Sequence, residues 1–574
     1  MSGAGDATVR YTRGGVACAG TSLAADTGSW RVQRPVHRHR PAPCHHACPA
    51  GEDPQAYLAY FEQGRPRAAW EILVAANPLP AVTGRVCPHP CEPACNRGRL
   101  DEAVAIHHVE RYLGDAALRE GWGLPVPEPV PVPDAARIAV VGAGPAGLSC
   151  AWQLLRLGHR VTVFEAEAQA GGACASAIPP YRLPRAVLEG ENARLLTLPG
   201  IDFRARQRLG RDFSIEELRE SYGAVFLAVG AQRPRVWSVD GVVPADLHPG
   251  LALLTEWVGV GRIPTPASVA VIGGGNTAMD LARVLKGAGV AQVYVITHNG
   301  LPGPDVPDED AMRALPREIV QAQEEGVEIL AHRGVRRLLL RGERVVGVEM
   351  VHMKKLPDAA GRLRRVAFDG TETVLHVDMV VPAIGEEIDP AGLESLLNGA
   401  GHLEIDASGA TASSGVFAGG DATLHGGTVT EAVGAGRRAA HGIDRWLREA
   451  PVAGPADRDE VAPVGIEGLN LAYYEQAPRA RENVLPVAER GGDAEIDRGL
   501  SEEQAGGEAR RCLSCGECLA CDNCFTLCPD SAVLKTREAA SDGSHYVFDY
   551  QHCKGCGLCA NECPCGFIEM VAED

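Results

Sequence analysis

Two glycine-rich turns, each placed between an apolar strand-like run and a helical pattern, constrain the fold of this chain most strongly. The first turn follows residues 138–141, and its glycines are Gly142, Gly144 and Gly147. Glycines at this spacing let the backbone approach a pyrophosphate, whose charge the N-terminus of the next helix stabilises. The following strand-like run, 160–164, ends in Glu165, which can accept a hydrogen bond from a ribose hydroxyl.

The second turn lies between a strand-like run at 268–272 and a helical pattern at 279–286. Its fingerprint residues are Gly273, Gly275, Asn276 and Ala278. Two dinucleotide folds in one chain indicate two nucleotides, and the usual pair is a flavin with a nicotinamide. We therefore predict FAD at the first turn and NAD(P)H at the second.

A third segment, VFAGGD at 416–421, fits the other half of a flavin site. Its strand would deliver Asp421, next to Gly420, to the ribityl chain, and a helix beginning near Thr428 would point its N-terminus at the isoalloxazine. No pair of cysteines of the disulfide-reductase kind accompanies this site, because Cys174 stands alone. A thiol–disulfide relay is therefore not expected.

Length, charge and cysteine content narrow the class of protein. A chain of 574 residues with a net charge of −19 should form several domains and avoid nucleic acid. No run approaches the roughly 20 apolar residues of a membrane span, and the N-terminal residues lack the apolar core of a secretory signal. We therefore expect a cytoplasmic protein, in which the 19 cysteines bind metal rather than form disulfides.

The C-terminal region repeats the pattern C-x2-C-x2-C-x3-C-P, the signature of a bacterial two-cluster ferredoxin. In this pattern the fourth cysteine of each run binds the cluster of the other run. One predicted [4Fe-4S] cluster has the ligands Cys518, Cys521, Cys524 and Cys563. The other has the ligands Cys553, Cys556, Cys559 and Cys528.

A second group of cysteines lies near the N-terminus, on both sides of a helical pattern at 54–76. It consists of Cys44, Cys48, Cys87, Cys91 and Cys95. Zinc is the alternative to an iron–sulfur cluster here, but five thiolates overfill one tetrahedral site. The histidines of this region are interpreted as ordinary residues rather than ligands.

The run TGRVCPHPCEPAC, followed by VAIHHVER, resembles the N-terminal iron–sulfur domain of the glutamate synthase small-subunit family. The same module occurs in dihydropyrimidine dehydrogenase and in an NADH-dependent ferredoxin:NADP reductase. The resemblance spans about residues 42 to 445. It implies two [4Fe-4S] clusters, one held by Cys48, Cys87, Cys91 and Glu110, and the other held in part by Cys44 and Cys95.

The chain departs from this family where two further ligands are expected. The family's E-A-x-R-C-x-x-C run is absent before Cys44, but EARRCLSC, with Cys512 and Cys515, occurs near the C-terminus. Our hypothesis is that this segment folds back and completes the cluster begun by Cys44 and Cys95, giving four [4Fe-4S] clusters in all. The alternative is a single N-terminal cluster, with Cys512 and Cys515 left spare.

The resemblance also bears on the nucleotide sites. It implies that the segment containing Gly172 and Arg182 lies along the flavin. Relatives that use NADPH carry an arginine pair after the second strand of the nicotinamide domain, where this chain has His298 and Asn299. An acid that would favour the bare ribose is also missing there. The choice between NADH and NADPH therefore stays open.

These features predict a multidomain chain with no catalytic acid, base or nucleophile. It would combine an α-helical iron–sulfur domain, two α/β Rossmann-like nucleotide domains in a glutathione reductase-like arrangement, and an α+β ferredoxin-like domain. The predicted parts are 1–122 (helical iron–sulfur), 136–255 (FAD, first part), 256–379 (NAD(P)), 380–448 (FAD, second part), 449–505 (connector) and 506–574 (ferredoxin-like).

The predicted function is electron transfer between NAD(P)H and a partner oxidoreductase or ferredoxin. NAD(P)H gives two electrons together whereas iron–sulfur clusters take one, so a flavin must stand between them. The chain would belong to a hetero-oligomer without nucleic acid or membrane. Extended members of the family it resembles include the diaphorase subunit of a 2-oxoacid:ferredoxin oxidoreductase, which is one candidate partner. One alternative is the glutamate synthase role, feeding a large glutamine-dependent subunit, and another is a non-catalytic redox or assembly module.

Overall fold

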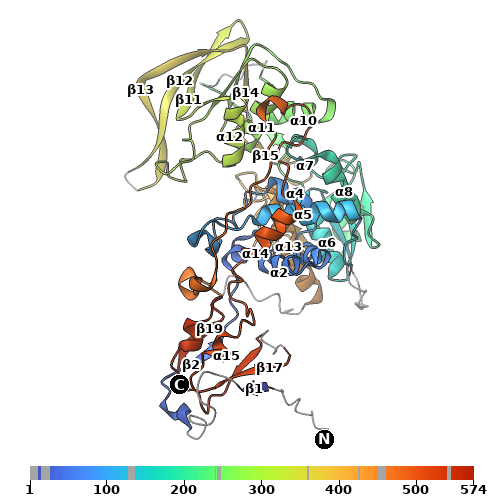
Figure 1. Cartoon of the computed structure of the whole chain (residues 1–574). Coiled ribbons are helices and arrows are strands. Elements are labelled where there is room, and N and C mark those ends of the chain that lie inside the picture. The colour runs from blue at the N-terminus through green and yellow to red at the C-terminus, as the bar shows by residue number, and fades with distance from the viewer. Residues whose placement is uncertain are drawn as a thin grey trace.

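The computed structural model describes residues 11–13, 26–126, 136–239, 241, 247–358, 361–424, 427–449, 461–538 and 544–573 (Figure 1). Parts of the predicted domains 1–122 and 449–505 lie outside these residues. None of the helices in the described ranges combines the length and the apolar character needed to cross a membrane.

The N-terminal helical domain forms a compact bundle. Its helices are α1 (Pro43–Ala47), α2 (Pro54–Glu62), α3 (Pro66–Ala76), α4 (Pro80–Val86), η2 (Asn96–Arg99) and α5 (Ile106–Glu120). The first four α-helices each begin with proline, which has no N–H to leave unpaired at a helix start. Tyr57, Trp70 and Leu113 are fully buried between them.

The FAD domain is built on a five-stranded sheet in the order β16-β6-β3-β4-β5, whose paired strands are all parallel. Its strands are β3 (Arg137–Val141), β4 (Arg160–Phe164), β5 (Ile201–Arg204), β6 (Ala224–Leu227) and β16 (Val416–Ala418). Its helices are α6 (Pro145–Arg156), α7 (Ala173–Ser176), α8 (Arg185–Leu196), α9 (Ile215–Ser221), η3 (Gly420–Ala422) and α13 (Val429–Arg448). Helices α6 and α13 cross closely, because a Cβ on Gly436 would lie 2.1 Å from the Ala146 carbonyl oxygen.

The nicotinamide domain interrupts the FAD domain and has a four-stranded parallel sheet in the order β10-β9-β8-β14. Its strands are β8 (Ser268–Ile272), β9 (Gln292–Ile296), β10 (Glu328–Leu330) and β14 (Met379–Pro382). Its helices are α10 (Gly250–Val260), α11 (Asn276–Gly287) and α12 (Pro316–Glu324). The short strands β7 (Arg233–Pro234) and β15 (Glu386–Glu387) pair where the chain passes between the two domains.

A second sheet extends from the nicotinamide domain as long antiparallel strands at the top left of Figure 1. It contains β11 (Arg333–Arg341), β12 (Arg344–Pro357) and β13 (Leu363–His376). Strand β13 forms one edge of this sheet and is exposed along almost its whole length.

The C-terminal module gathers both ends of the chain at the bottom of Figure 1. Its elements are α15 (Asn523–Thr526), β17 (Val533–Thr536), β18 (Tyr546–Phe548), α16 (Leu558–Asn561) and β19 (Ile568–Ala572). Helix α14 (Glu502–Arg510), at the start of the predicted domain 506–574, packs instead on α2 and α5 of the helical bundle. Strand β2 (Gln33–His37) pairs with β19, and β1 (Tyr11–Arg13) pairs with β17. The first part of the predicted domain 1–122 therefore lies with the ferredoxin-like module rather than with the helical bundle. The short helix η1 (Thr27–Trp30) also lies there, bonded from Gly28 N to the Gln551 carbonyl oxygen (2.9 Å).

The described part of the connector runs irregularly along the surface, with only the short helices η5 (Ile466–Gly468), η6 (Leu471–Tyr473) and η7 (Val487–Glu489). Ion pairs fix it on both sides. Glu495 pairs with Arg85 and Arg111 of the helical bundle, and Arg490 pairs with Glu324 and Glu325 at the end of α12.

Candidate functional site

A cleft opens at the carboxyl ends of β3, β4, β6 and β16, with about 1100 Å³ of space between protein atoms, part of it open solvent. The predicted flavin residues that line it are Gly142, Gly144, Glu165, Gly172, Gly420 and Asp421. Ligands of open α/β sheets bind at this edge. The cleft thus lies where the sequence places the flavin.

The glycines of the first turn are required by close backbone contacts. Gly142 has φ +104°, and a Cβ there would lie 2.3 Å from the Ala228 carbonyl oxygen. A Cβ on Gly147 would lie 1.9 Å from the Gly142 carbonyl oxygen, so this glycine lets α6 pack on the turn. Gly144 has room for a Cβ, with Gly172 Cα at 3.8 Å, and its side faces the cleft. This cradle fits a pyrophosphate.

Polar groups at both ends of the cleft are held in place. Glu165 accepts hydrogen bonds from the backbone N–H groups of Ala143 (2.8 Å) and Glu167 (2.9 Å), and burial raises the pKa of its carboxyl. A carboxylate has lone pairs for further donors, such as ribose hydroxyls. Thr428 caps α13 by accepting from Glu431 N (3.2 Å), and Ala432 in the first turns of that helix lines the cleft.

Arg182 is placed differently from the prediction that it contacts the flavin. It does not line the cleft, and its buried guanidinium bonds both carboxylate oxygens of Asp280 on α11 (2.6 and 2.7 Å). Its Nε lies 3.0 Å from Glu318 on α12. Since a buried guanidinium needs carboxylate partners, these two acids hold it away from the cleft. Arg182 joins the segment beside the FAD cleft to the nicotinamide domain.

The second turn has the same close geometry. Gly273 has φ +150°, and a Cβ there would lie 2.1 Å from the Ala383 carbonyl oxygen. Gly275 is the N-cap of α11, Asn276 begins the helix and accepts a hydrogen bond from Leu315 N (3.0 Å), and Ala278 is fully buried. The turn therefore fits a dinucleotide fold.

His298 follows β9, half-buried, beside this turn.

The N-terminal ligand candidates form two buried groups. The inner set, Cys48, Cys87, Cys91 and Glu110, brings its four side chains into mutual electrostatic contact. Burial and then Glu110 raise the pKa of Cys87 to about 12. The Glu110 carboxylate also accepts hydrogen bonds from Thr83 and from Asn77 (3.2 Å), which fixes its orientation. Three thiols and one carboxylate make a donor set that suits an iron–sulfur cluster.

The structure brings Cys512 and Cys515 to Cys44 and Cys95, and these four residues are named the fold-back set. Burial, followed by Cys512, Cys95 and Cys515, raises the pKa of Cys44. Hydrogen bonds between segments far apart in sequence stabilise this contact. Arg97 donates to the Arg511 carbonyl oxygen (3.0 Å), and Glu508 accepts from Ala105 N (2.7 Å).

The C-terminal cysteines line two small cavities with the crossed pattern expected of a ferredoxin. The first tail set, Cys518, Cys521, Cys524 and Cys563, lines one cavity. The second tail set, Cys528, Cys553, Cys556 and Cys559, lines the other. Every cysteine in the described residues is free, so all these thiols are available to a metal.

Two residues between the fold-back set and the first tail set were not singled out by the sequence. Cys565 lines the first tail cavity, with its sulfur 3.7 Å from that of Cys563, and its carbonyl oxygen accepts from Gly516 N (2.6 Å). The Tyr474 hydroxyl donates to the Leu513 carbonyl oxygen (2.8 Å), and Cys565, Cys515 and Cys512 add to burial in raising the pKa of this tyrosine. A lone cysteine and a connector tyrosine carry no spacing that would reveal this position.

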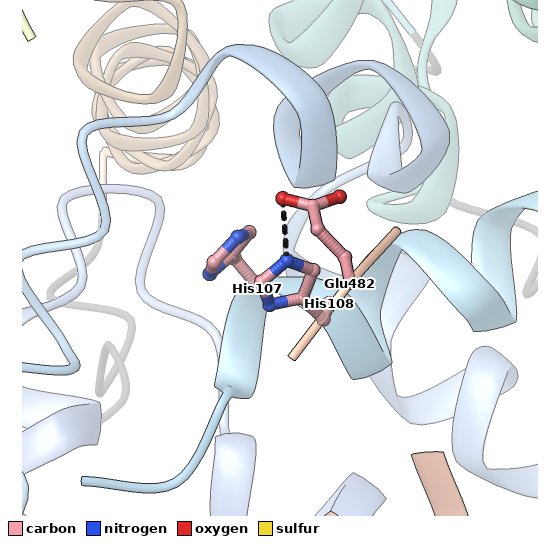
Figure 2. Close-up of side chains that lie close together, drawn as sticks. All are labelled: His107, His108 and Glu482. Atoms are coloured by element: carbon pink, nitrogen blue, oxygen red, sulfur yellow. Dashed lines mark ion pairs between the residues drawn. The ribbon is translucent and has the colours of Figure 1, made fainter. Parts of the chain in front are cut away.

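The histidines His107 and His108 on α5 are buried beside Glu482 of the connector (Figure 2). His108 Nε2 lies 2.9 Å from Glu482, and His107 Nδ1 lies 2.6 Å from Glu92. Arg111 lies 3.7 Å from Glu482, and Arg479 lies 2.6 Å from Glu92. Because arginines already pair with both carboxylates, the cluster stabilises the connector on α5 and disfavours a cation.

Comparison with known protein families covers the three chemical regions. Residues 136–439 match the family described as pyridine nucleotide-disulphide oxidoreductase. Residues 32–122 match dihydropyrimidine dehydrogenase domain II with its 4Fe-4S cluster, and residues 546–569 match a 4Fe-4S binding domain.

Similar proteins share most of the chain. The NADP(+)-dependent formate dehydrogenase subunit beta of Moorella thermoacetica is 36% identical over 517 residues, 83% of this chain and 70% of that protein. The NADPH-Fe(3+) oxidoreductase subunit beta of Geobacter sulfurreducens is 34% identical, covering 84% of this chain and 77% of that protein. The NADPH glutamate synthase small chain of Escherichia coli is 31% identical, covering 70% of this chain and 88% of that protein.

Proposed function

We propose that this chain, which belongs to the pyridine nucleotide-disulphide oxidoreductase family, uses its nucleotide folds and cysteine sets as one electron-transfer path. The chain is an NAD(P)H-dependent oxidoreductase with FAD and [4Fe-4S] clusters. It moves electrons between NAD(P)H and a partner oxidoreductase or ferredoxin. Its resemblance to the glutamate synthase small-subunit family is confirmed by its relatives.

The nucleotide sites follow from the two turns. FAD would bind in the cleft through Gly142, Gly144, Glu165, Gly172, Gly420 and Asp421, with Gly147 shaping the turn and Thr428 capping the helix. NAD(P)H would bind at Gly273, Gly275, Asn276, Ala278 and His298. When bound, the flavin converts a two-electron hydride into single electrons that clusters can accept. The residues of the chain position the rings and exclude water.

One contact carries the proposed path from the flavin to the inner set. In the first turn of α13, Thr430 lies beside Cys87 and acts to lower the pKa of its thiol, and Ala432 on the same helix lines the FAD cleft. The loop beside Cys48 packs on this helix as well, since a Cβ on Gly434 would lie 1.9 Å from the Pro49 carbonyl oxygen. The inner set is therefore proposed as the first cluster after the flavin.

Neighbouring cysteines then order the other sets. Cys48 of the inner set is close in the chain to Cys44 of the fold-back set, on the short helix α1. Only Gly516 and Glu517 separate Cys515 of the fold-back set from Cys518 of the first tail set. The two tail sets are linked because each contains one cysteine from the other's sequence run: Cys563 lies in the first tail set and Cys528 in the second. The proposed order is flavin, inner set, fold-back set, first tail set, second tail set.

The tail is proposed as the place where electrons pass between this chain and the partner subunit. Cys521 and Cys556, one from each tail set, are exposed, whereas the inner set is enclosed by the helical bundle. The relatives are named as subunits of formate dehydrogenase and glutamate synthase, so those enzymes join 2-oxoacid oxidoreductase as candidate partners. Anaerobic purification with mass spectrometry would identify the partner. Isolation of the chain alone, with full ferredoxin reductase activity, would contradict an obligate partner subunit.

The fold-back set is tested by the double variant Cys512→Ala/Cys515→Ala. Four clusters correspond to about 16 iron atoms per chain, and we expect the variant to hold about 12. Anaerobic iron analysis and electron paramagnetic resonance of the reduced protein measure this loss. Cys174→Ala is the matched control, because Cys174 is buried beside the FAD cleft and belongs to none of the sets. Unchanged iron in the double variant would show that Cys512 and Cys515 are spare.

A further inference from the structure

The residues that directly follow β9 in the nicotinamide domain include no arginine. Strand β8 carries the glycine turn, and β9 lies next to it in the sheet. In such folds the residues just after β9 contact the 2′-position of the ribose. Here they are Thr297, His298 and Asn299. Selection for or against a 2′-phosphate must therefore come from another segment.

The strands β11 and β12 are attached to this end of β9 by backbone hydrogen bonds. Arg333 N donates to the Thr297 carbonyl oxygen (2.9 Å), and His332 N donates to the Asn299 carbonyl oxygen (3.1 Å). Met353 N of β12 in turn donates to the His332 carbonyl oxygen (2.9 Å). The distal half of the β12–β13 hairpin is thus held beside the end of β9.

Two cations of this hairpin share one face. Lys355 on β12 and Arg365 on β13 are direct cross-strand partners. Lys355 Nζ donates to the Glu309 carbonyl oxygen, in the loop that follows His298. Like charges directly opposite each other destabilise a sheet unless an anion neutralises them. The pair therefore provides a place for an anionic group beside the loop.

The electrostatic surroundings of His298 match this placement. Burial, followed by Arg365 and Lys355, lowers the pKa of His298 to about 4, whereas Asp310 raises it. The imidazole is neutral at pH 7, and its buried Nε2 has no hydrogen-bond partner among the described residues.

Arg313 and Asp310 complete the charges near this pair. Arg313 adds to burial in lowering the pKa of Arg365. The buried carboxylate of Asp310 is 3.8 Å from His332 Nδ1. Asp305, Asp308 and Glu309 of the same loop are exposed to solvent. Lys355, Arg365 and Arg313 thus face one buried carboxylate, which leaves an excess of positive charge suited to a dianionic phosphate.

We propose that Lys355 and Arg365 bind the 2′-phosphate of NADPH, with His298 beside it, and that this chain therefore prefers NADPH to NADH. The guanidinium and ammonium groups supply from the hairpin the charge that is missing next to β9. The proposal rests on the proposed function of the second turn as the NAD(P)H site. It assigns the nucleotide specificity to a segment outside the dinucleotide fold itself.

The test compares the holoprotein with the double variant Lys355→Gln/Arg365→Gln. Calorimetry measures binding of adenosine 2′,5′-bisphosphate and of AMP, and flavin bleaching gives kcat/KM for NADPH and NADH. We expect the wild type to bind the bisphosphate at least about tenfold more tightly than AMP, a difference of about 1.4 kcal/mol. In the variant, this preference and the ratio of kcat/KM for NADPH over NADH should both fall by a similar factor.

A matched control removes the same charge from the opposite face of the hairpin. Lys354 and Arg364 adjoin the proposed pair in sequence, and neighbouring side chains of a strand point to opposite faces. Lys354→Gln/Arg364→Gln should therefore keep the wild-type bisphosphate affinity and nucleotide ratio. An equal loss in both double variants, or no loss in the first, would overturn the proposal. If neither nucleotide bleaches the flavin of the wild type, the proposed function fails instead.

Discussion

At the residue scale, the glycines of the first turn have different tasks although they look alike in sequence. Gly142 and Gly147 are fixed by contacts within the protein, since added Cβ atoms would lie 2.3 and 1.9 Å from carbonyl oxygens. Gly144 faces the cleft and meets nothing closer than 3.8 Å. Within this turn, Gly142 and Gly147 are therefore needed for the fold, whereas Gly144 leaves space for the cofactor.

This difference predicts opposite results for two alanine variants. Gly147→Ala should destabilise the flavin-free protein by about 1–3 kcal/mol, because the new methyl group must displace backbone. Gly144→Ala should destabilise the apoprotein less, by about 1 kcal/mol, because the new methyl group displaces no atom and the cost is that alanine is a poorer N-cap than glycine. It should nevertheless lose FAD, because the methyl group occupies the approach to the pyrophosphate. Urea unfolding of the apoprotein and flavin content after desalting measure the two effects. Equal unfolding midpoints for both variants would contradict this division.

Arg182 shows what residue-level prediction leaves out. Its place beside a flavin-lining segment suggested contact with the cofactor, but Asp280 and Glu318 hold the guanidinium elsewhere. Asp280 is distant from Arg182 in the sequence, and no local pattern predicts that these two residues pair. The sequence shows that an arginine is present, whereas burial with two acids decides its partner.

At the element scale, the N-terminal strand β2 is part of the ferredoxin-like module. It pairs with β19, and Arg31 just before it bonds both carboxylate oxygens of Glu573 (2.6 and 2.8 Å). Arg31 also donates to the carbonyl oxygens of Tyr550 and Cys553 (2.5 and 3.0 Å), at the start of the second tail loop. One side chain from the N-terminal segment thus holds a loop that carries cluster ligands.

We expect Arg31→Met to loosen the second tail loop, because Glu573 and two carbonyl groups lose their donor. Hydrogen bonds to a charged group contribute about 1.5–3 kcal/mol each. Iron should therefore be released to a chelator several-fold faster than from the wild type. Arg38→Met is the control, since the Arg38 side chain is largely exposed and lies 3.4 Å from Glu569. Release rates that are the same for Arg31→Met and the wild type would contradict this role of the N-terminal segment.

At the scale of the whole molecule, the proposed order of the four cysteine sets leads from the FAD cleft to the tail. The inner set packs behind α13, the fold-back set joins segments from both halves of the chain, and the tail sets reach the surface. The connector links the helical bundle to α12 through ion pairs on both sides. Electrons would therefore reach a partner through the tail rather than directly from the inner set.

The double variant Cys521→Ser/Cys556→Ser tests this order. Removing one ligand from each tail set should leave flavin bleaching by NAD(P)H unchanged, because the nucleotide sites are remote from the tail. Ferredoxin reduction should fall by an order of magnitude or more. Stopped-flow absorbance separates the two steps, and anaerobic iron analysis verifies that only tail clusters are affected. Full ferredoxin reduction in this variant would place the port at the inner or fold-back set.

The sequence by itself determined the two dinucleotide turns and the doubled ferredoxin motif. Strands β4 and β8 have the predicted bounds, and β3 and α11 differ only near their ends. These features were readable because glycine turns and ligand spacings are fixed by neighbours within a few turns of chain. The cofactors followed from them, the family followed from the N-terminal cysteine run, and both were confirmed.

Only the tertiary structure decided which distant segments meet. It placed Asn96 3.5 Å from the Cys515 sulfur, β2 beside β19, and Lys355 and Arg365 near the end of β9. Such contacts depend on how whole domains pack, and each partner alone has an ordinary local pattern. Local sequence motifs therefore determine the chemistry of this protein, whereas long-range packing determines the order and specificity of its sites.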